Sequence, residues 1–132
     1  MNRLLIDTNI YVAFKRGNPA VVELLGRAEK IVLCSVVIGE LLAGFRSGNQ
    51  ASKNRQQLES FSANARVGTC SLNANTAEFY AAVFTQLKQK GRPIPTNDMW
   101  IAASAMQNGL AICTLDAHFE SIDGILIRHP VS

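Results

Sequence analysis

A chain of 132 residues has room for one domain with a hydrophobic core of its own, and we predict a single domain over residues 1–132. Hydrophobic residues make up 48% and charged residues 17% of the chain, the balance of an ordinary globular protein, and no run approaches the roughly 20 apolar residues of a membrane span. The net charge of +3 permits a polyanionic partner without demanding one.

The first predicted strand, residues 3–6, is apolar after its arginine, as is usual for a central strand of a parallel sheet. Asp7 and Asn9 interrupt this apolar run too early for the core of a signal peptide, so a cytoplasmic protein is expected. Thr8 or Asn9 can cap the helix that follows. Pro19 suits the first turn of a second helix, which runs to about residue 28.

A second strand is predicted at residues 31–34, and Ser35 can cap a helix that extends to about residue 45. The most polar part of the chain, residues 46–57, predicts a solvated helical hairpin. A short, weakly patterned third strand is predicted at residues 66–70.

In the second half, the longest helix ends near residue 90, where Gly91 can stop it. Thr96 or Asn97 can cap a further helix that runs to residue 108. The last two strands are predicted at residues 111–114 and 125–127. Strands that alternate with helices predict an α/β fold, with a mainly parallel five-stranded sheet covered by helices on both faces.

The cysteines, Cys34, Cys70 and Cys113, lie in or beside apolar runs that read as strands. They are odd in number and show no C-x-x-C spacing. We therefore predict free, buried thiols in a reducing compartment.

Four acidic residues stand beside apolar residues, where a carboxylate is costly to bury without compensation. Asp7 ends the first strand, Asp116 follows the fourth, and Asp98 lies in the first turn of a helix. Glu40 interrupts an apolar helix about a turn and a half after the second strand. Ligands of open parallel sheets bind beyond the carboxyl ends of the strands, so we expect all four side chains at this edge.

Three of the acids also have structural interpretations. Asp7 could begin the first helix, Asp98 could be a favourable charge in a helical first turn, and Asp116 could form an Asx-turn. Together, however, the four carboxylates would repel one another and raise their pKa values unless a cation compensates them. Mg²⁺ or Mn²⁺ suits oxygen ligands and can activate water for attack on a phosphodiester, which predicts a metal-dependent hydrolase.

Four local motifs, at these positions, carry a resemblance to a known family. The motifs are Leu4-Leu5-Ile6-Asp7-Thr8-Asn9, Ser35-Val36-Val37-Ile38-Gly39-Glu40-Leu41, Asn97-Asp98-Met99-Trp100-Ile101-Ala102-Ala103 and Thr114-Leu115-Asp116-Ala117-His118-Phe119. In their order and spacing, over essentially the whole chain, they resemble the PIN-domain ribonucleases, and specifically the VapC-type toxins of toxin–antitoxin pairs.

The resemblance implies a PIN-like three-layer α/β/α sandwich and cleavage of RNA with Mg²⁺ or Mn²⁺. It also implies a homodimer and inhibition by a cognate antitoxin protein. By carry-over, Asp7, Glu40, Asp98 and Asp116 are the catalytic acids and the metal ligands. The RNA target is not implied, because the targets differ between members of the family.

Supporting roles are open to several neighbours of these acids. Thr114 could orient a carboxylate or bond a metal-bound water, or could be a buried, satisfied hydroxyl. Asn9 could face a phosphate, although capping explains both Thr8 and Asn9 better. His118 invites assignment as a general base, but packing beside Phe119 is the favoured interpretation.

One basic cluster, Lys88, Lys90 and Arg92, precedes the helix that begins near Asp98. We expect it near the active edge of the sheet, where it could bind the phosphates of RNA. The alternative is a solvated helix end, where cations are favoured by the helix dipole.

Three other classes of protein are alternatives to this assignment. A haloacid-dehalogenase-type phosphatase needs a second aspartate where Asn9 stands, and a response-regulator receiver needs an aspartate that Cys70-Ser71-Leu72 does not offer. The remaining alternative is a catalytically silent PIN-like scaffold that binds RNA or protein. The four intact acids argue against it.

Overall fold

The computed structural model describes residues 2–131, so the two ends of the predicted 1–132 domain lie outside the described residues. Its core is a five-stranded sheet in the order β3-β2-β1-β4-β5, in which every neighbouring pair is parallel. The strands are β1 (Arg3–Ile6), β2 (Lys30–Cys34), β3 (Val67–Cys70), β4 (Ala111–Cys113) and β5 (Ile127–Arg128). The predicted parallel sheet is confirmed, with its last strand beginning two residues later and ending one residue later than predicted.

Each predicted helix is present. The helices are α1 (Thr8–Lys15), α2 (Pro19–Gly26), α3 (Ser35–Ser47), α4 (Ala51–Ser62), α5 (Ala74–Lys90) and α6 (Thr96–Asn108). A short 3₁₀ helix, η1 (His118–Ser121), was not predicted. The predicted hairpin in the polar segment is the α3–α4 pair, joined by the turn after Ser47.

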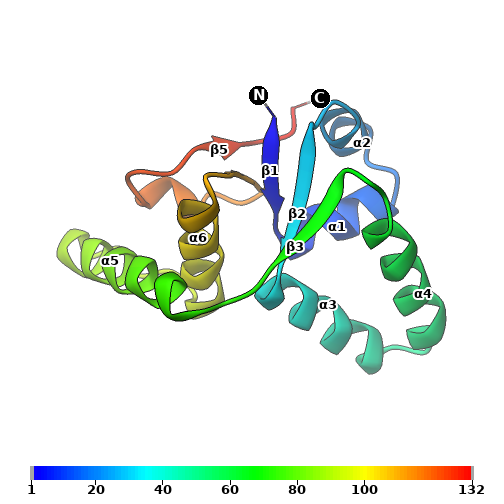
Figure 1. Cartoon of the computed structure of the whole chain (residues 1–132), viewed down its shortest axis with the longest axis horizontal. Helices are drawn as coiled ribbons and strands as arrows, with labels where there is room; N and C mark the ends of the chain where they lie inside the picture. The colour runs from blue at the N-terminus through cyan, green and yellow to red at the C-terminus, as the bar shows by residue number, and fades with distance from the viewer. Residues whose placement is uncertain (1, 132) are drawn as a thin grey trace.

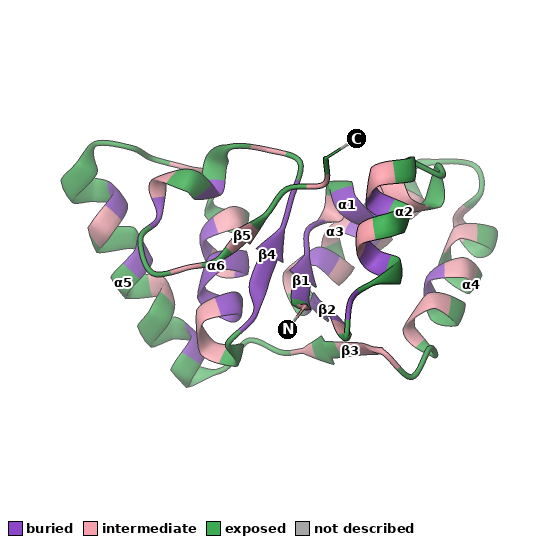
Figure 2. Cartoon of the chain, turned by 90° about the horizontal axis from the view of Figure 1, so that it is seen from above, coloured by how far each residue is buried: buried purple, intermediate pink, exposed green. Residues whose placement is uncertain are grey.

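The helices form two layers on opposite sides of the sheet, with α1, α2 and α4 on one side and α5 and α6 on the other (Figures 1 and 2). This confirms the three-layer α/β/α sandwich. After β3 the chain crosses to the other side of β1 and forms β4, so the direction in which strands are added reverses between β1 and β4. Such a reversal opens a crevice at the carboxyl ends of the two strands, where ligands of α/β proteins bind.

The hydrophobic core is centred on β1, where Leu4, Leu5 and Ile6 have no exposed surface. The buried residues run through the centre of the molecule in Figure 2. A central strand of a parallel sheet has helices on both faces and therefore buries every side chain. On α3, Val37 and Leu41 are buried at helical spacing, and this leaves Glu40 on a half-buried flank of the helix.

Three predicted helix caps are wrong. Asp7 caps α1, with Oδ1 accepting from the backbone N–H of Ile10 at 3.0 Å, and Ser35 is the first residue of α3 instead of its cap. Helix α6 begins at Thr96 directly after Pro95, whose extended backbone leads into the helix without a side-chain cap. Proline has a fixed φ that suits this entry but carries no side-chain acceptor, so the first N–H groups of α6 have no side-chain cap.

Cys34 and Cys113 are buried, Cys70 is half-buried, and all three are free thiols, as predicted. Burial raises the pKa of Cys70 to about 11 and that of Cys113 to about 12, so neither is a reactive thiolate at neutral pH. Over residues 2–131, none of the helices combines the length and apolar character needed to cross a membrane.

Candidate active site

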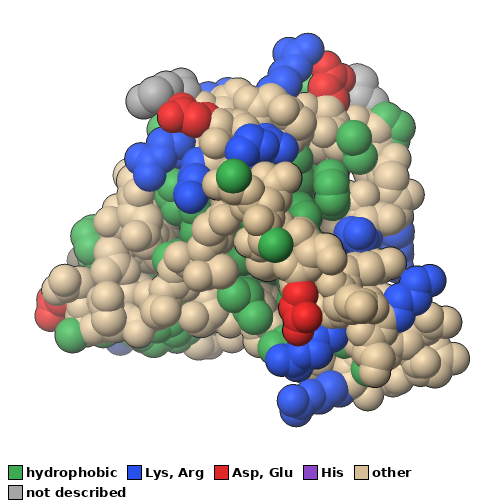
Figure 3. All heavy atoms as spheres, turned by 45° about the vertical axis from the view of Figure 1, so that its right-hand side comes forward, with side chains coloured by type: hydrophobic (Ala, Val, Ile, Leu, Met, Phe, Trp, Pro, Cys, Tyr) green, Lys and Arg blue, Asp and Glu red, His purple; other side chains and the backbone are tan. Residues whose placement is uncertain are grey.

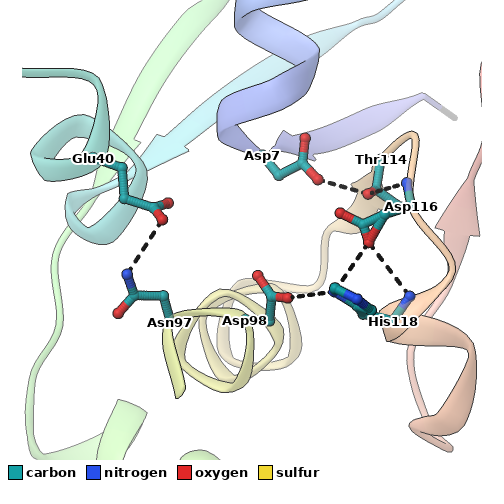
Figure 4. Close-up of polar contacts among 7 residues, drawn as sticks. All are labelled: Asp7, Glu40, Asn97, Asp98, Thr114, Asp116 and His118. Atoms are coloured by element: carbon teal, nitrogen blue, oxygen red, sulfur yellow. Dashed lines mark hydrogen bonds and ion pairs between the residues drawn. The ribbon is translucent and has the colours of Figure 1, made fainter. Parts of the chain in front are cut away.

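The four acids singled out by the sequence come from four separate elements. Asp7 follows β1, Glu40 lies in α3, Asp98 lies in the first turn of α6, and Asp116 follows β4. Figure 4 shows their carboxyl groups around a common space, with Glu40 facing the other three. The fold therefore brings together the side chains that were expected at the carboxyl edge of the sheet.

Asp7 is the most buried of these acids, with 5% of its surface exposed. Its Oδ1 caps α1, and its Oδ2 accepts a hydrogen bond of 2.6 Å from the hydroxyl of Thr114. Burial raises the pKa of Asp7, the bonds from Thr114 and Ile10 oppose this, and the charges of Asp116 and Asp98 raise it further. The structural role proposed for Asp7 is correct, and the same carboxylate also faces the other acids.

Thr114 is fully buried and connects two of the acids. Its hydroxyl donates to Asp7 and accepts from the backbone N–H of Asp116 at 3.1 Å. The hydroxyl is therefore buried and satisfied, and one of its partners is a carboxylate. This contact holds the segment after β4 against the end of β1. A bond from Thr114 to a metal-bound water stays a prediction.

His118 lies between two of the acids, as Figure 4 shows. Its Nδ1 is 3.0 Å from Oδ2 of Asp98 and 3.3 Å from Oδ1 of Asp116, and 52% of its side chain is exposed. The favoured packing interpretation is wrong, because Phe119 alone turns into the core, with no exposed surface. The short spacing from Asp116 to His118 was the sequence signal for this contact.

Glu40 is held at both oxygens by residues that were expected to be helix caps. The Thr8 hydroxyl donates to Oε1 at 2.7 Å, and Nδ2 of Asn97 donates to Oε2 at 3.2 Å. Because Asp7 caps α1 and Pro95 precedes α6, Thr8 and Asn97 are free to make these contacts. Sequence reasoning missed both, although each residue directly neighbours an acid of the site.

The cluster carries negative charge that no lysine or arginine among the described residues relieves. Burial raises the pKa of Asp98, and the charges of Asp116 and Glu40 raise it further, while His118 opposes the shift. Across residues 2–131, no lysine or arginine is ion-paired with any of the four acids. Mutual repulsion of this kind favours a bound cation.

The donor set fits a hard divalent cation, because carboxylate oxygens are its preferred ligands. As the side chains lie, no three histidine, cysteine, aspartate or glutamate side chains in the described part of the chain are gathered closely enough to hold one ion. Asp98 and Asp116 turn instead toward His118. The case for a divalent cation therefore rests on the oxygen ligands that the four carboxylates offer and on the repulsion between these carboxylates.

The basic cluster predicted to bind phosphate is partly engaged elsewhere. Nζ of Lys90 is 2.9 Å from Oδ1 of Asp123 and donates to the carbonyl of Ser121 at 2.8 Å. Lys88 lines a mainly apolar cavity of about 350 Å³ beside Phe84. The C-terminal end of α5, which carries both lysines, lies at the far left of Figure 1, away from the sheet. Phosphate binding by Lys88, Lys90 and Arg92 stays a prediction.

Comparison with known proteins adds independent observations. Residues 4–125 match the family model of the PIN domain. Ribonuclease VapC5 of Mycobacterium tuberculosis is 26% identical over 120 residues, which cover 91% of this chain and 87% of that protein. Ribonuclease VapC2 of Rickettsia felis is 27% identical over 130 residues, 95% of this chain and 96% of that protein.

A solved structure agrees with these matches. The crystal structure of VapBC2 from Rickettsia felis bound to a DNA fragment from their promoter contains a chain that superposes on this one with a TM-score of 0.83. The two chains are 26% identical, and the superposition covers 96% of this chain and 97% of that chain. The matched lengths include the elements that carry all four acids.

Proposed function

The chain belongs to the PIN-domain family, and on that premise we propose that it is an endoribonuclease, the toxin of a type II toxin–antitoxin system, acting in the cytoplasm as a single domain. The ribonuclease relatives support this activity. The observation that carries the proposal is the convergence of four carboxylates, two of them with raised pKa values, around one space where no lysine or arginine of residues 2–131 is paired with them.

The proposed cofactor is Mg²⁺ or Mn²⁺, held by Asp7, Glu40, Asp98 and Asp116. When bound, the cation supplies charge neutralisation at the phosphodiester and activation of water. The finer assignment of each acid as catalytic rests on the resemblance of the motifs and on the donor chemistry.

The surrounding side chains position the acids. Thr114 holds Asp7 by a charge-assisted hydrogen bond, and Thr8 and Asn97 fix both oxygens of Glu40. Such contacts lower the cost of reorganisation when a cation and a phosphate enter. His118 restrains Asp98 and Asp116, and its exposed ring leaves it within reach of an incoming substrate.

The proposed partner is a cognate antitoxin, and the α3–α4 hairpin is its proposed docking surface. Helix α3 carries Glu40 in the site and Arg46 in its last turn, so one helix joins the hairpin to the acids. A cavity of about 410 Å³ between α3 and α4 is lined by Leu42 and Leu58. A segment that folds on binding could dock there and place an arginine among the carboxylates. The toxin itself is proposed to form a homodimer.

The docking proposal is checked with the product of the neighbouring gene, expected to be a small protein with a flexible, basic C-terminal half. Co-expression should suppress toxicity, and Arg46→Glu should weaken the complex more than it weakens cleavage. If no neighbouring product binds and overexpression does not slow growth, the toxin assignment fails while the nuclease assignment stands or falls on its own.

The experiment for the catalytic site is the Asp7→Asn substitution. Metal-dependent cleavage of RNA should fall more than about 100-fold, because even residues that merely orient a metal ligand are worth about 10- to 100-fold. The fold should persist, since Asn can still cap α1. Mn²⁺ should raise the Tm of the wild type and not of the variant.

The matched control is Asp123→Asn, which changes the same charge at an exposed ion pair with Lys90. It should leave cleavage and the Mn²⁺ response unchanged. Wild-type cleavage by Asp7→Asn would rule out the proposed site. A wild type that binds RNA but neither cleaves it nor responds to Mn²⁺ would favour the silent scaffold.

A further inference from the structure

An open groove runs from the acid cluster along α1 to the α1–α2 turn. It has a volume of about 590 Å³, within the range of roughly 300 to 1,000 Å³ typical of ligand sites. Asp116 and Leu115 line it at one end, and Arg16 and Pro19 line it at the other. Whatever occupies this groove therefore lies against one of the four acids.

The walls of the groove combine three kinds of side chain. Arg16 is exposed and makes no side-chain hydrogen bond or ion pair to any other residue from 2 to 131. Asn9 is exposed in the first turn of α1, and Leu115 is 47% exposed although it is apolar. The cation of Arg16 suits the phosphate of a nucleotide, and the amide of Asn9 suits the polar edge of its base. The apolar surface of Leu115 suits the face of the base.

The backbone around Arg16 is well fixed. Arg16 directly follows α1 as its C-cap, with its N–H donating to the carbonyl of Val12 at 3.0 Å. Gly17 then reverses the chain with a φ of +79°, which favours glycine. Asn18 then caps α2 by accepting from the N–H of Val21 at 3.2 Å. The guanidinium thus extends from a rigid turn instead of from a loose loop.

Charge decides which way an RNA strand can leave the acid cluster. The carboxylates repel the phosphates on either side of the scissile one, so a neighbouring phosphate needs a cation close by. Among residues 2–131, Arg16 is the sole lysine or arginine that lines this groove. On the face turned forward in Figure 3, basic side chains are spread in separate groups, and acidic ones are fewer. Lys90, by contrast, is already paired with Asp123.

We propose that this groove binds the nucleotide next to the scissile phosphate, with Arg16 on its backbone phosphate, Asn9 hydrogen-bonding to its polar edge and Leu115 packing against its base. The proposal rests on the proposed ribonuclease function and adds a substrate subsite to it. Arg16 also lines a second cavity of about 340 Å³ together with Lys15, so the strand has a basic path beyond this nucleotide.

The experiment measures binding of short single-stranded RNA by fluorescence anisotropy, with Asp7→Asn as the background so that RNA is not cleaved. Adding Arg16→Gln should weaken binding on the order of tenfold, the loss expected for one charge-assisted contact. The plot of log K against log salt should become shallower by about 0.7, the value for one phosphate contact to a single strand. Arg16→Lys should restore part of the affinity.

Arg27→Gln is the matched control. Arg27 is exposed at the end of α2, just before β2 begins, and so lies at the opposite edge of the sheet from the acids. The Arg27→Gln substitution removes the same charge as Arg16→Gln and should alter neither the affinity for RNA nor the salt dependence of RNA binding. Adding one nucleotide to the RNA should raise its affinity when the nucleotide is added at one end of the strand and not at the other. Arg16→Gln should abolish that gain in affinity.

The outcomes separate this inference from the one on which it rests. If the wild type neither binds nor cleaves RNA, the proposed function fails and the subsite with it. If the wild type cleaves RNA but Arg16→Gln behaves like Arg27→Gln, the subsite alone is overturned. It is also overturned if Arg16→Gln weakens binding of a protein partner and leaves RNA binding intact.

Discussion

Two polar clusters of this molecule have similar hydrogen-bonding groups and opposite electrostatics. In the first, Asn73, Thr76 and Gln107 join the start of α5 to the end of α6. Asn73 caps α5 by accepting from the N–H of Thr76 at 3.1 Å, Gln107 donates to Asn73 at 3.0 Å, and Thr76 is fully buried. Every member is neutral, and donors meet acceptors.

The second cluster is the group of acids at the other end of α6. Thr114, Thr8, Asn97 and His118 contact its carboxylates, yet the pKa values of Asp7 and Asp98 are raised. Here the hydrogen bonds give the carboxylate oxygens partners without neutralising their negative charge. The comparison teaches that a matched polar cluster stabilises a fold, whereas a cluster with surplus charge at a sheet edge indicates a ligand.

Among the substitutions that test this difference between the two clusters, Thr114→Val is expected to have the largest effect. The change keeps the shape of the side chain and removes the donor to Asp7 and the acceptor for the N–H of Asp116. Affinity for Mn²⁺ should fall about 10- to 100-fold, as for loss of a residue that orients a metal ligand. Isothermal titration calorimetry measures this directly.

Thr69→Val, at an exposed position of β3, is the control for Thr114→Val and should leave Mn²⁺ affinity unchanged. Equal affinities of Thr114→Val and wild type would show that the Thr114–Asp7 contact is structural only.

A smaller effect, on stability, is expected from Asn73→Ala in the neutral cluster. Loss of this cap should lower the free energy of unfolding by about 1 kcal/mol, because the first turn of α5 loses its side-chain acceptor. Cleavage of RNA and affinity for Mn²⁺ should stay at wild-type values. Urea denaturation followed by circular dichroism checks the stability.

Asn75→Ala, two residues further into α5 and exposed, should change stability by less than Asn73→Ala. A large loss of cleavage in folded Asn73→Ala would contradict the division of the molecule into a structural and a functional polar cluster.

The smallest effect concerns pH. The pKa values of Asp7 and Asp98 are raised above 3.8 in the folded chain, so above pH 3.8 the folded state binds more protons than the unfolded state. The stability of the metal-free protein should therefore decrease as pH rises from 3.8 through the raised values, and level off above them. Denaturation in EDTA at a series of pH values measures this decrease.

The decrease should become shallower in Asp98→Asn, which removes one of the two raised carboxyls. Mn²⁺ should oppose it at the upper end of the range, because a bound cation favours the charged forms. A metal-free protein whose stability rises over this window would contradict the raised pKa values of Asp7 and Asp98, which burial and the neighbouring acids cause.

Much of the fold was predictable from the sequence because its signals are local. The apolar run after Arg3 and the alternation of strands and helices indicated a parallel sheet, and the glycines that end α5 and α6 adopt φ values of +63°. The four acids were found because each one disturbs an apolar pattern. Thr114 was a candidate as well, but the contacts of Thr8 and Asn97 to Glu40 were missed, since both residues sit where a cap is also expected.

Whether such a residue caps a helix or contacts an acid of the site depends on partners that are distant in the sequence. Asp7 and its partner Thr114 are 107 positions apart, and Asn97 and Glu40 are 57 apart. No local pattern records such a contact. The shift of β5 to Ile127–Arg128 has the same origin, because its bounds are set by pairing with β4.

The strand order has a consequence for synthesis of the protein on the ribosome. Strands β1, β2 and β3 emerge first, but the other neighbour of β1 is β4, which begins at Ala111. Proteins are made at about 5 to 20 residues per second, so these strands are exposed before β4 has been made. Until β4 emerges, the last acid and the Thr114 contact to Asp7 are both missing. On the proposed function, we therefore expect a nascent chain to lack nuclease activity until the residues that follow β4 have emerged and joined Asp7.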